Sequence, residues 1–309
     1  MAGSIFYDLP EQECQPDLRG FQWLDLRRAV EQAPEPLDFV LPGFKSGTVG
    51  ALVSPGATGK TMLALQATVT VSGGPDMLDF SSMDTAWRRT AGRVVFLTGE
   101  DPADVLNWRF HAIGKRLNTA EKQAMFENLS VAPLVGRGTD LMTFGWQHWI
   151  ASVTREARLV VIDTLRRFHQ LEENDGADMA RLVAYMEQLC RENSTTVLFL
   201  HHTNKAGAQN GGDAQQASRG SSVLTDNARF QANLVGMTPE QAKQFDVDEN
   251  CRRNFVRLSF PKINYSAPIP DQWFRRRDGG LLEPAILECG TFNSAKAGSF
   301  QKAGKRDQA

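Results

Sequence analysis

The stretch from Ser54 to Thr61 has the residue types and spacing of a phosphate-binding loop. Glycine allows a tight turn, so that successive backbone N–H groups can point at one anion. Lys60 would then reach the β- and γ-phosphates, and the Thr61 hydroxyl would ligate Mg²⁺. The stretch therefore predicts binding of a nucleoside triphosphate with Mg²⁺, through Ser54, Pro55, Gly56, Ala57, Thr58, Gly59, Lys60 and Thr61.

The loop departs from the pattern G-x-x-x-x-G-K-[ST] at one position, where Ser54 replaces the first glycine. This change removes no side chain that contacts phosphate. The loop also lies between an apolar run at 49–53 and an apolar, helix-like segment from residue 62. Because a strand, a loop and a helix in that order are the context of a phosphate-binding loop, a chance glycine turn is the weaker alternative.

Two further apolar runs end in carboxylates, at the edge where an open α/β sheet places its ligands. Residues 158–162 predict a buried strand whose terminal Asp163 joins the Mg²⁺ shell; an Asp that merely caps a buried strand is the alternative. Residues 93–97 predict a second buried strand, after which Glu100 could align a water for in-line attack. The alternative is a carboxylate that caps the next helix, and Asp101 before Pro102 fits that role better than Glu100 does.

A third strand, predicted at 196–200, ends in His201 and His202. Adjacent residues of a strand point to opposite faces, so the two histidines do not form a shared metal site by themselves. A polar group at this strand tip could instead sense the γ-phosphate.

These stretches belong to an α/β pattern with a mainly parallel central sheet flanked by helices, and with antiparallel strands at the C-terminus. Helices are expected at 26–33, after the phosphate-binding loop, at 102–117, 119–128, 146–156 and 179–192, and from residue 238. Further strands are expected at 129–134, 254–260 and within 265–282. We expect a flexible N-terminal arm at 1–25, one domain at 26–290, a loop at 170–178, a mobile surface loop at 204–222, and a disordered basic tail at 291–309.

Composition limits the functions that the chain can have. A net charge of −2 excludes a uniformly basic nucleic-acid binder, so any contact with nucleic acid must come from local basic loops or from a ring of subunits. Four scattered cysteines argue against a zinc site or a disulfide framework and fit a reducing cytosol. No apolar run is long enough to span a membrane, and we expect a cytoplasmic protein.

Taken together, the loop 54–61, residues 97–102 and 161–169 and the histidine strand resemble the RecA-type ATPase core. Residues 215–224 and 273–276 resemble the RepA-type replicative helicases of broad-host-range IncQ-type plasmids, and the similarity covers about residues 26–288. The resemblance implies a homohexameric ring that hydrolyses ATP, moves along single-stranded DNA and unwinds the duplex. It also names a plasmid replication initiator and a primase as candidate partners.

The resemblance implies a role for each matching residue. Lys60 and Thr61 match the phosphate and Mg²⁺ contacts, Asp163 the metal shell, Glu100 the general base, His202 the γ-phosphate sensor, Arg229 the arginine finger that reaches into the neighbouring subunit, and Arg109 a further phosphate contact. From the residues alone, Arg219 competes with Arg229 for the finger role.

Contact with DNA is expected from the loops that follow the Asp163 and histidine strands. Arg166, Arg167, Lys205 and Arg219 are candidate phosphate binders that a ring would repeat around its channel. Solvated loop charges are an equal alternative for any one of them. Trp273, which is followed by arginines, fits a packed strand aromatic better than a base-stacking residue.

Three other functions are alternatives, and the first of them would share every nucleotide-binding residue named above. A RecA-like regulatory or recombination ATPase would assemble on DNA without unwinding it. A small-molecule kinase is disfavoured because no arginine-rich lid is evident and because of the position of Glu100. A non-catalytic initiator module would leave Lys60, Glu100 and Asp163 unexplained.

Overall fold

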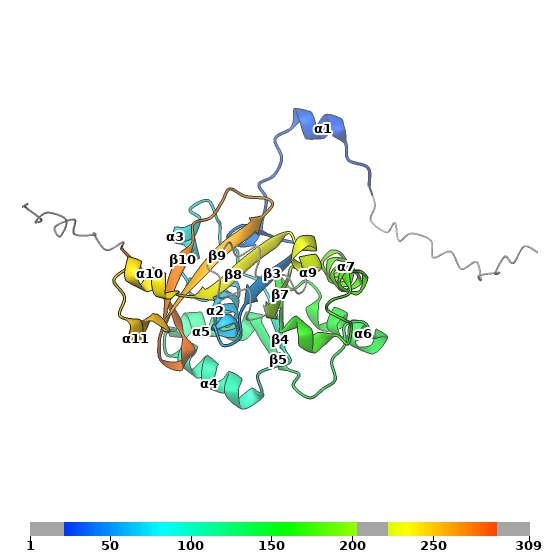
Figure 1. Cartoon of the computed structure of the whole chain (residues 1–309). Coiled ribbons are helices and arrows are strands. Elements are labelled where there is room, and N and C mark those ends of the chain that lie inside the picture. Colours follow the sequence, from blue (N-terminus) through cyan, green and yellow to red (C-terminus); the bar gives the residue numbers. More distant parts are fainter. Residues whose placement is uncertain (1–21, 203–221, 289–309) are drawn as a thin grey trace, which may run out of the picture. The chain divides into compact units, whose positions relative to one another are not determined.

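A computed structural model describes residues 22–202 and 222–288 of the chain (Figure 1). The contacts divide the chain into two units between Leu37 and Asp38. The first unit contains helix α1 (Leu26–Glu31), at which the Asp25 side chain accepts a hydrogen bond of 3.0 Å from the Arg28 N–H. None of the α1 residues is buried. The expected domain boundaries at 25 and 290 remain predictions.

The second unit is built on a nine-stranded sheet in the order β11-β10-β9-β8-β3-β7-β6-β4-β5. The strands from β8 to β5 in this order are parallel, and β9, β10 and β11 extend the sheet antiparallel. Their bounds are β3 (Val49–Ser54), β4 (Val94–Thr98), β5 (Leu129–Pro133), β6 (Leu159–Asp163), β7 (Val197–His202), β8 (Phe230–Gly236), β9 (Phe255–Ile263), β10 (Gln272–Arg276) and β11 (Leu282–Pro284). The predicted α/β class, with its antiparallel C-terminal strands, is confirmed.

Helices cover both faces of this sheet, as Figure 1 shows. The parallel strands are apolar on both sides because alternate residues serve different faces. Val94 and Phe96 pack in the core beneath α2, α4 and α5, whereas Val95 and Leu97 pack in the core beneath α6 and α7. These helices are α2 (Lys60–Val71), α4 (Ala103–Gly114), α5 (Thr119–Asn128), α6 (Phe144–Thr154) and α7 (Gly176–Asn193). In the part of the chain that the structure describes, no helix is long and apolar enough to cross a membrane.

Several short elements were not predicted, because two to six residues are too few to show a period. Strands β1 (Phe39–Leu41) and β2 (Phe44–Lys45) pair with each other, and Phe44 stacks on Phe230 with ring centroids 4.7 Å apart. The other short elements are α3 (Phe80–Met83), η1 (Leu165–Phe168), α9 (Ser222–Asn227), α11 (Glu249–Arg252) and η3 (Asp278–Gly280). Helix α10 (Pro239–Gln244) is the helix expected from residue 238, and Thr238 and Gln241 form its capping box.

The loop expected at 170–178 is shorter than predicted. Helix α7 already begins at Gly176, because the Asp175 side chain accepts hydrogen bonds from the N–H groups of Ala177 and Asp178. The loop expected at 204–222 lies largely outside the described residues, as do the basic tail and most of the N-terminal arm.

A bidentate ion pair joins the start of the second unit to the central sheet. The Arg158 guanidinium donates hydrogen bonds of 2.8 and 2.7 Å to the two carboxylate oxygens of Asp38. This hydrogen bonding lowers the pKa of Asp38 below its usual value of 3.8. A carboxyl group whose pKa is lower in the folded state stabilises the fold above its unfolded pKa, and this contribution is lost as the pH falls through the folded value.

We expect Asp38→Asn to lower the free energy of unfolding by about 1 kcal/mol at pH 7, because a half-exposed ion pair contributes no more than that. The difference from wild type should begin to shrink below about pH 4, where the unfolded carboxyl group takes up its proton, and should disappear as the pH falls through the lower pKa of folded Asp38. Urea unfolding at pH 7 and pH 3 measures both effects. Glu187→Gln, an exposed change on α7, is the matched control; an equal loss in both variants, or a loss independent of pH, would contradict the assignment.

Candidate active site

The phosphate-binding loop connects β3 to α2 and has the backbone that such a loop requires. Gly59 takes a φ of 100°, a conformation that favours glycine, and Ala57 is also left-handed, with a φ of 61°. Gly56, by contrast, keeps a φ outside this region, so its presence is not explained by the turn. Ser54 is the buried last residue of β3 and does not have a positive φ, so its backbone does not require the glycine of the usual pattern.

The predicted residues meet because four neighbouring parallel strands end at one edge of the sheet. The order β3-β7-β6-β4 places Ser54 opposite His202, and Asp163 opposite Thr98. Strand β7 therefore lies between the phosphate-binding strand and the strand of Asp163. The position of β7 lets His202 reach both Lys60 and Glu100.

Lys60, His202, Glu100 and Thr164 form a continuous chain of polar contacts. The Lys60 Nζ lies 3.1 Å from His202 Nδ1, and His202 Nε2 lies 3.3 Å from Glu100 Oε1. Lys60 Nζ also lies 3.4 Å from His202 Nε2. Since an ammonium group can only donate, the neutral tautomer that satisfies both Lys60 and Glu100 accepts at Nδ1 and carries its proton on Nε2. The Thr164 hydroxyl donates a second hydrogen bond of 2.9 Å to Glu100 Oε1.

These donors keep Glu100 ionised. The hydrogen bond from His202, followed by that from Thr164 and the charge of Lys60, lowers the pKa of Glu100 to about 2. A group with so low a pKa is a weak proton acceptor at neutral pH. What this geometry supports is a carboxylate that orients a water molecule.

Lys60 and Asp163 are the buried charges of the site. Lys60 is 4% exposed and Asp163 is completely buried. Burial lowers the pKa of Lys60, and the negative charges of Asp163 and Glu100 oppose this shift. Burial raises the pKa of Asp163, and the nearby Thr61 hydroxyl opposes that shift. Thr61 makes no hydrogen bond of ordinary geometry, so both carboxylate oxygens of Asp163 are buried without a hydrogen-bond partner among the described residues.

The alternative interpretation of the acidic pair as helix caps is wrong. The N-cap of α4 is Pro102, and no side chain caps this helix. The backbone N–H groups of Glu100 and Asp101 instead donate to the Thr98 hydroxyl, each at 3.3 Å. Asp101 forms an ion pair of 2.9 Å with Arg109 Nε. This pairing places Arg109 next to the carboxylates of the site.

The structure does not bring every predicted residue to the site. Arg229 is exposed at the start of β8, where its N–H donates to the Val49 carbonyl. Val49 begins β3, so Arg229 lies at the opposite edge of the sheet from the phosphate-binding loop, roughly 17 Å along the strand at about 3.3 Å per residue. Within one chain, Arg229 therefore cannot contact the nucleotide held by its own loop.

The candidate DNA contacts are only partly described. Arg166 and Arg167 are exposed in η1, which follows Asp163 directly after Thr164. Lys205 and Arg219 lie outside the described residues. Trp273 is half-buried against Phe245, with ring centroids 5.6 Å apart, which matches the expected packed aromatic.

The two histidines point to opposite sides of β7, as predicted. His201 is buried, and burial lowers its pKa to about 4, whereas the His202 side chain is 40% exposed at the site. Two functional groups were missed. Thr164 could have been found beside Asp163. The Nη2 of Arg276 donates a hydrogen bond of 2.5 Å to the Thr58 carbonyl. The sequence does not predict this contact, because 218 positions separate the two residues.

We expect Glu100→Gln to lower ATP turnover by about a hundredfold or more while nucleotide binding persists, because an uncharged amide cannot accept hydrogen bonds from a water and orient it as a carboxylate does. Steady-state turnover and calorimetric titration with ADP measure the two properties separately. Asp104→Asn makes the same chemical change at an exposed position of α4 and should leave both properties unchanged. Wild-type turnover in Glu100→Gln would remove Glu100 from the reaction.

Comparisons with known proteins agree with this geometry. A solved ATPase domain of another protein has a similar fold, at 14% identity and a TM-score of 0.54, over 84% of this chain and 96% of that one. A structure of a DnaB-like replicative helicase and its interactions with primase matches at 16% identity and a TM-score of 0.54, over 88% of this chain and 68% of that one. At such identities the likeness shows a shared fold and no more. A family described as AAA domain matches residues 15–208, and the chain belongs to that family.

Proposed function

We propose that this protein is an ATP-dependent DNA helicase that acts in replication, a ring-shaped motor moving on single-stranded DNA. The observation that carries the proposal is the convergence of Lys60, His202, Glu100 and Asp163 at one edge of the sheet. The fold likeness of the chain to a solved ATPase domain supports ATP hydrolysis, and its likeness to a DnaB-like replicative helicase supports the extension to DNA unwinding.

The residues present fit a nucleotide-bound Mg²⁺. A buried carboxylate without a hydrogen-bond partner is costly unless a cation or donor joins it, and Asp163 is such a group among the described residues. Asp163 and the Thr61 hydroxyl supply the hard oxygen ligands that Mg²⁺ prefers. When bound, the ion neutralises charge on the β- and γ-phosphate oxygens.

Lys60, Glu100 and His202 then have separate roles in the reaction. Lys60 places a positive charge beside the transferring phosphoryl group, and its burial strengthens that interaction. Glu100 orients the attacking water. Because His202 contacts both Lys60 and Glu100, a change in the position of Lys60 at the γ-phosphate can reach the Glu100 carboxylate.

We further propose a homohexamer of the RepA type found in IncQ-type plasmids, with nucleotide between subunits. The exposed position of Arg229, away from its own phosphate-binding loop, supports a role as the finger for a neighbour. Arg166, Arg167, Lys205 and Arg219 would bind DNA phosphates in the ring's channel. A replication initiator and a primase are the proposed protein partners, and the primase that interacts with the DnaB-like helicase supports the second.

We expect single-stranded DNA to stimulate ATP turnover by about fivefold or more, because a motor couples its DNA loops to the nucleotide site. Steady-state turnover with and without a single-stranded oligonucleotide tests this, and Lys60→Ala, which should abolish hydrolysis, is the blank. Turnover that ignores DNA would favour a RecA-like regulatory ATPase instead. Near-normal turnover in Lys60→Ala would overturn the nucleotide site itself.

We expect Arg229→Ala to lower turnover by about a thousandfold, because a finger neutralises charge in the transition state. Mixing this variant with Lys60→Ala should restore part of the activity, since some interfaces then combine an intact Lys60 with an intact Arg229. Turnover across a series of mixing ratios measures the recovery. A shared interface is contradicted when no ratio recovers activity.

A further inference from the structure

The hairpin formed by β10, η3 and β11 contacts the phosphate-binding loop through Arg276. Arg276, the last residue of β10, donates a hydrogen bond of 2.5 Å from Nη2 to the carbonyl oxygen of Thr58. A Cβ built on Gly59 would lie 3.6 Å from the same Nη2. The guanidinium therefore lies directly against the Thr58–Gly59 peptide.

Arg276 is an unusual group to find there, because it has no carboxylate partner among the described residues. Its Nε is buried without a hydrogen-bond partner in that part of the chain, and burial lowers the pKa of the side chain. A half-buried cation normally pairs with an anion. Here the guanidinium instead donates to a backbone carbonyl of the loop.

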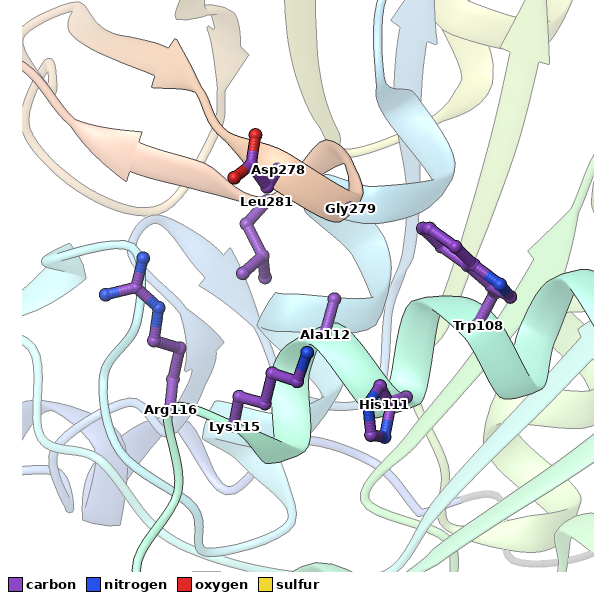
Figure 2. A pocket seen from close by; sticks show the side chains of 8 residues that line it. All are labelled: Trp108, His111, Ala112, Lys115, Arg116, Asp278, Gly279 and Leu281. Atoms are coloured by element: carbon purple, nitrogen blue, oxygen red, sulfur yellow. The ribbon is translucent and has the colours of Figure 1, made fainter.

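The hairpin that carries Arg276 is held in place by contacts with both helices of the site. The buried amide of Gln66, in α2, makes two hydrogen bonds to the backbone of Leu282, of 2.9 and 2.8 Å. On the other side, a Cβ built on Gly279 would lie 2.5 Å from the Cβ of Ala112 in α4, so only glycine fits. Figure 2 shows this turn above α4, beside a cavity of about 550 Å³.

A second link ties the hairpin to the end of α4. Glu283 of β11 forms ion pairs of 2.7 Å with both Arg116 and Arg277. The position of Arg276 is thus set by contacts of its hairpin with α2 and α4.

The geometry of the peptide group sets the direction of the Gly59 N–H. In a trans peptide the C=O and the next N–H point in opposite directions, so a donor on the Thr58 oxygen leaves the Gly59 N–H pointing away from Arg276. The Gly59 N–H donates to no atom of the described residues. A cation on the carbonyl also polarises the peptide and makes its N–H a stronger donor.

We propose that Arg276 is a positioning residue for the nucleotide, which holds the Thr58–Gly59 peptide so that the Gly59 N–H faces the phosphate chain. The proposal rests on the nucleotide site proposed above. Without the hydrogen bond from Arg276, the Thr58–Gly59 peptide can rotate, because glycine tolerates both signs of φ. The residue therefore serves binding of the phosphates, while Lys60 and Glu100 remain in place for the chemical step.

The test compares Arg276→Met with Arg276→Lys and with the control Arg275→Met. Methionine keeps the aliphatic stem but has no donor, whereas lysine can still donate to the carbonyl. Arg275 is the adjacent residue, exposed on the other side of β10 and placed over the Phe255 ring at 5.8 Å. Thermal unfolding of each variant confirms that the fold is retained.

We expect Arg276→Met to raise the KM for ATP and the dissociation constant for ADP about tenfold, with kcat within about twofold of wild type. Arg276→Lys should recover at least part of the affinity, and Arg275→Met should match wild type. The inference is overturned if Arg276→Met binds ADP as wild type does, if lysine rescues nothing, or if Arg275→Met loses as much affinity. If wild type itself neither binds ADP nor turns over ATP, it is the proposed function that fails.

Discussion

The burial of the Lys60 ammonium beside two carboxylates is the interaction on which the site depends. A buried cation is costly unless anions and hydrogen-bond acceptors surround it. Asp163 and Glu100 supply the negative charge, and His202 accepts the hydrogen bond. Each of these groups lies at or just after the end of a different strand, so the charge balance holds only while four strand ends stay in register.

Register in turn depends on the apolar character of the parallel strands. Their residues are buried on both faces, and a shift of one residue would exchange the two hydrophobic cores. Strand β7 lies between β3 and β6 in this sheet. Its position sets His202 between the lysine and the carboxylate of Glu100.

The antiparallel strands at the C-terminus do more than extend the sheet. Leu282 of β11 forms a hydrogen bond with Gln66 of α2, which lies 216 positions earlier in the chain. Arg276 of β10 contacts the phosphate-binding loop. The helix that follows Glu100 packs against the same hairpin. The two halves of the nucleotide site, one at α2 and one at α4, therefore share a common support.

The sequence alone specified what depends on neighbours along the chain. The loop 54–61, the strands that end in Asp163 and His202 and the capping box at Thr238 are local patterns, and the structure contains each of them. It did not specify the strand order, the hydrogen bond from Thr164 to Glu100, the rejection of helix capping by Asp101, or the contact of Arg276 with Thr58. Local periodicity and spacing reflect the geometry of one helix or strand, whereas these features arise only when packing brings distant segments together, and only the tertiary structure decides which segments meet.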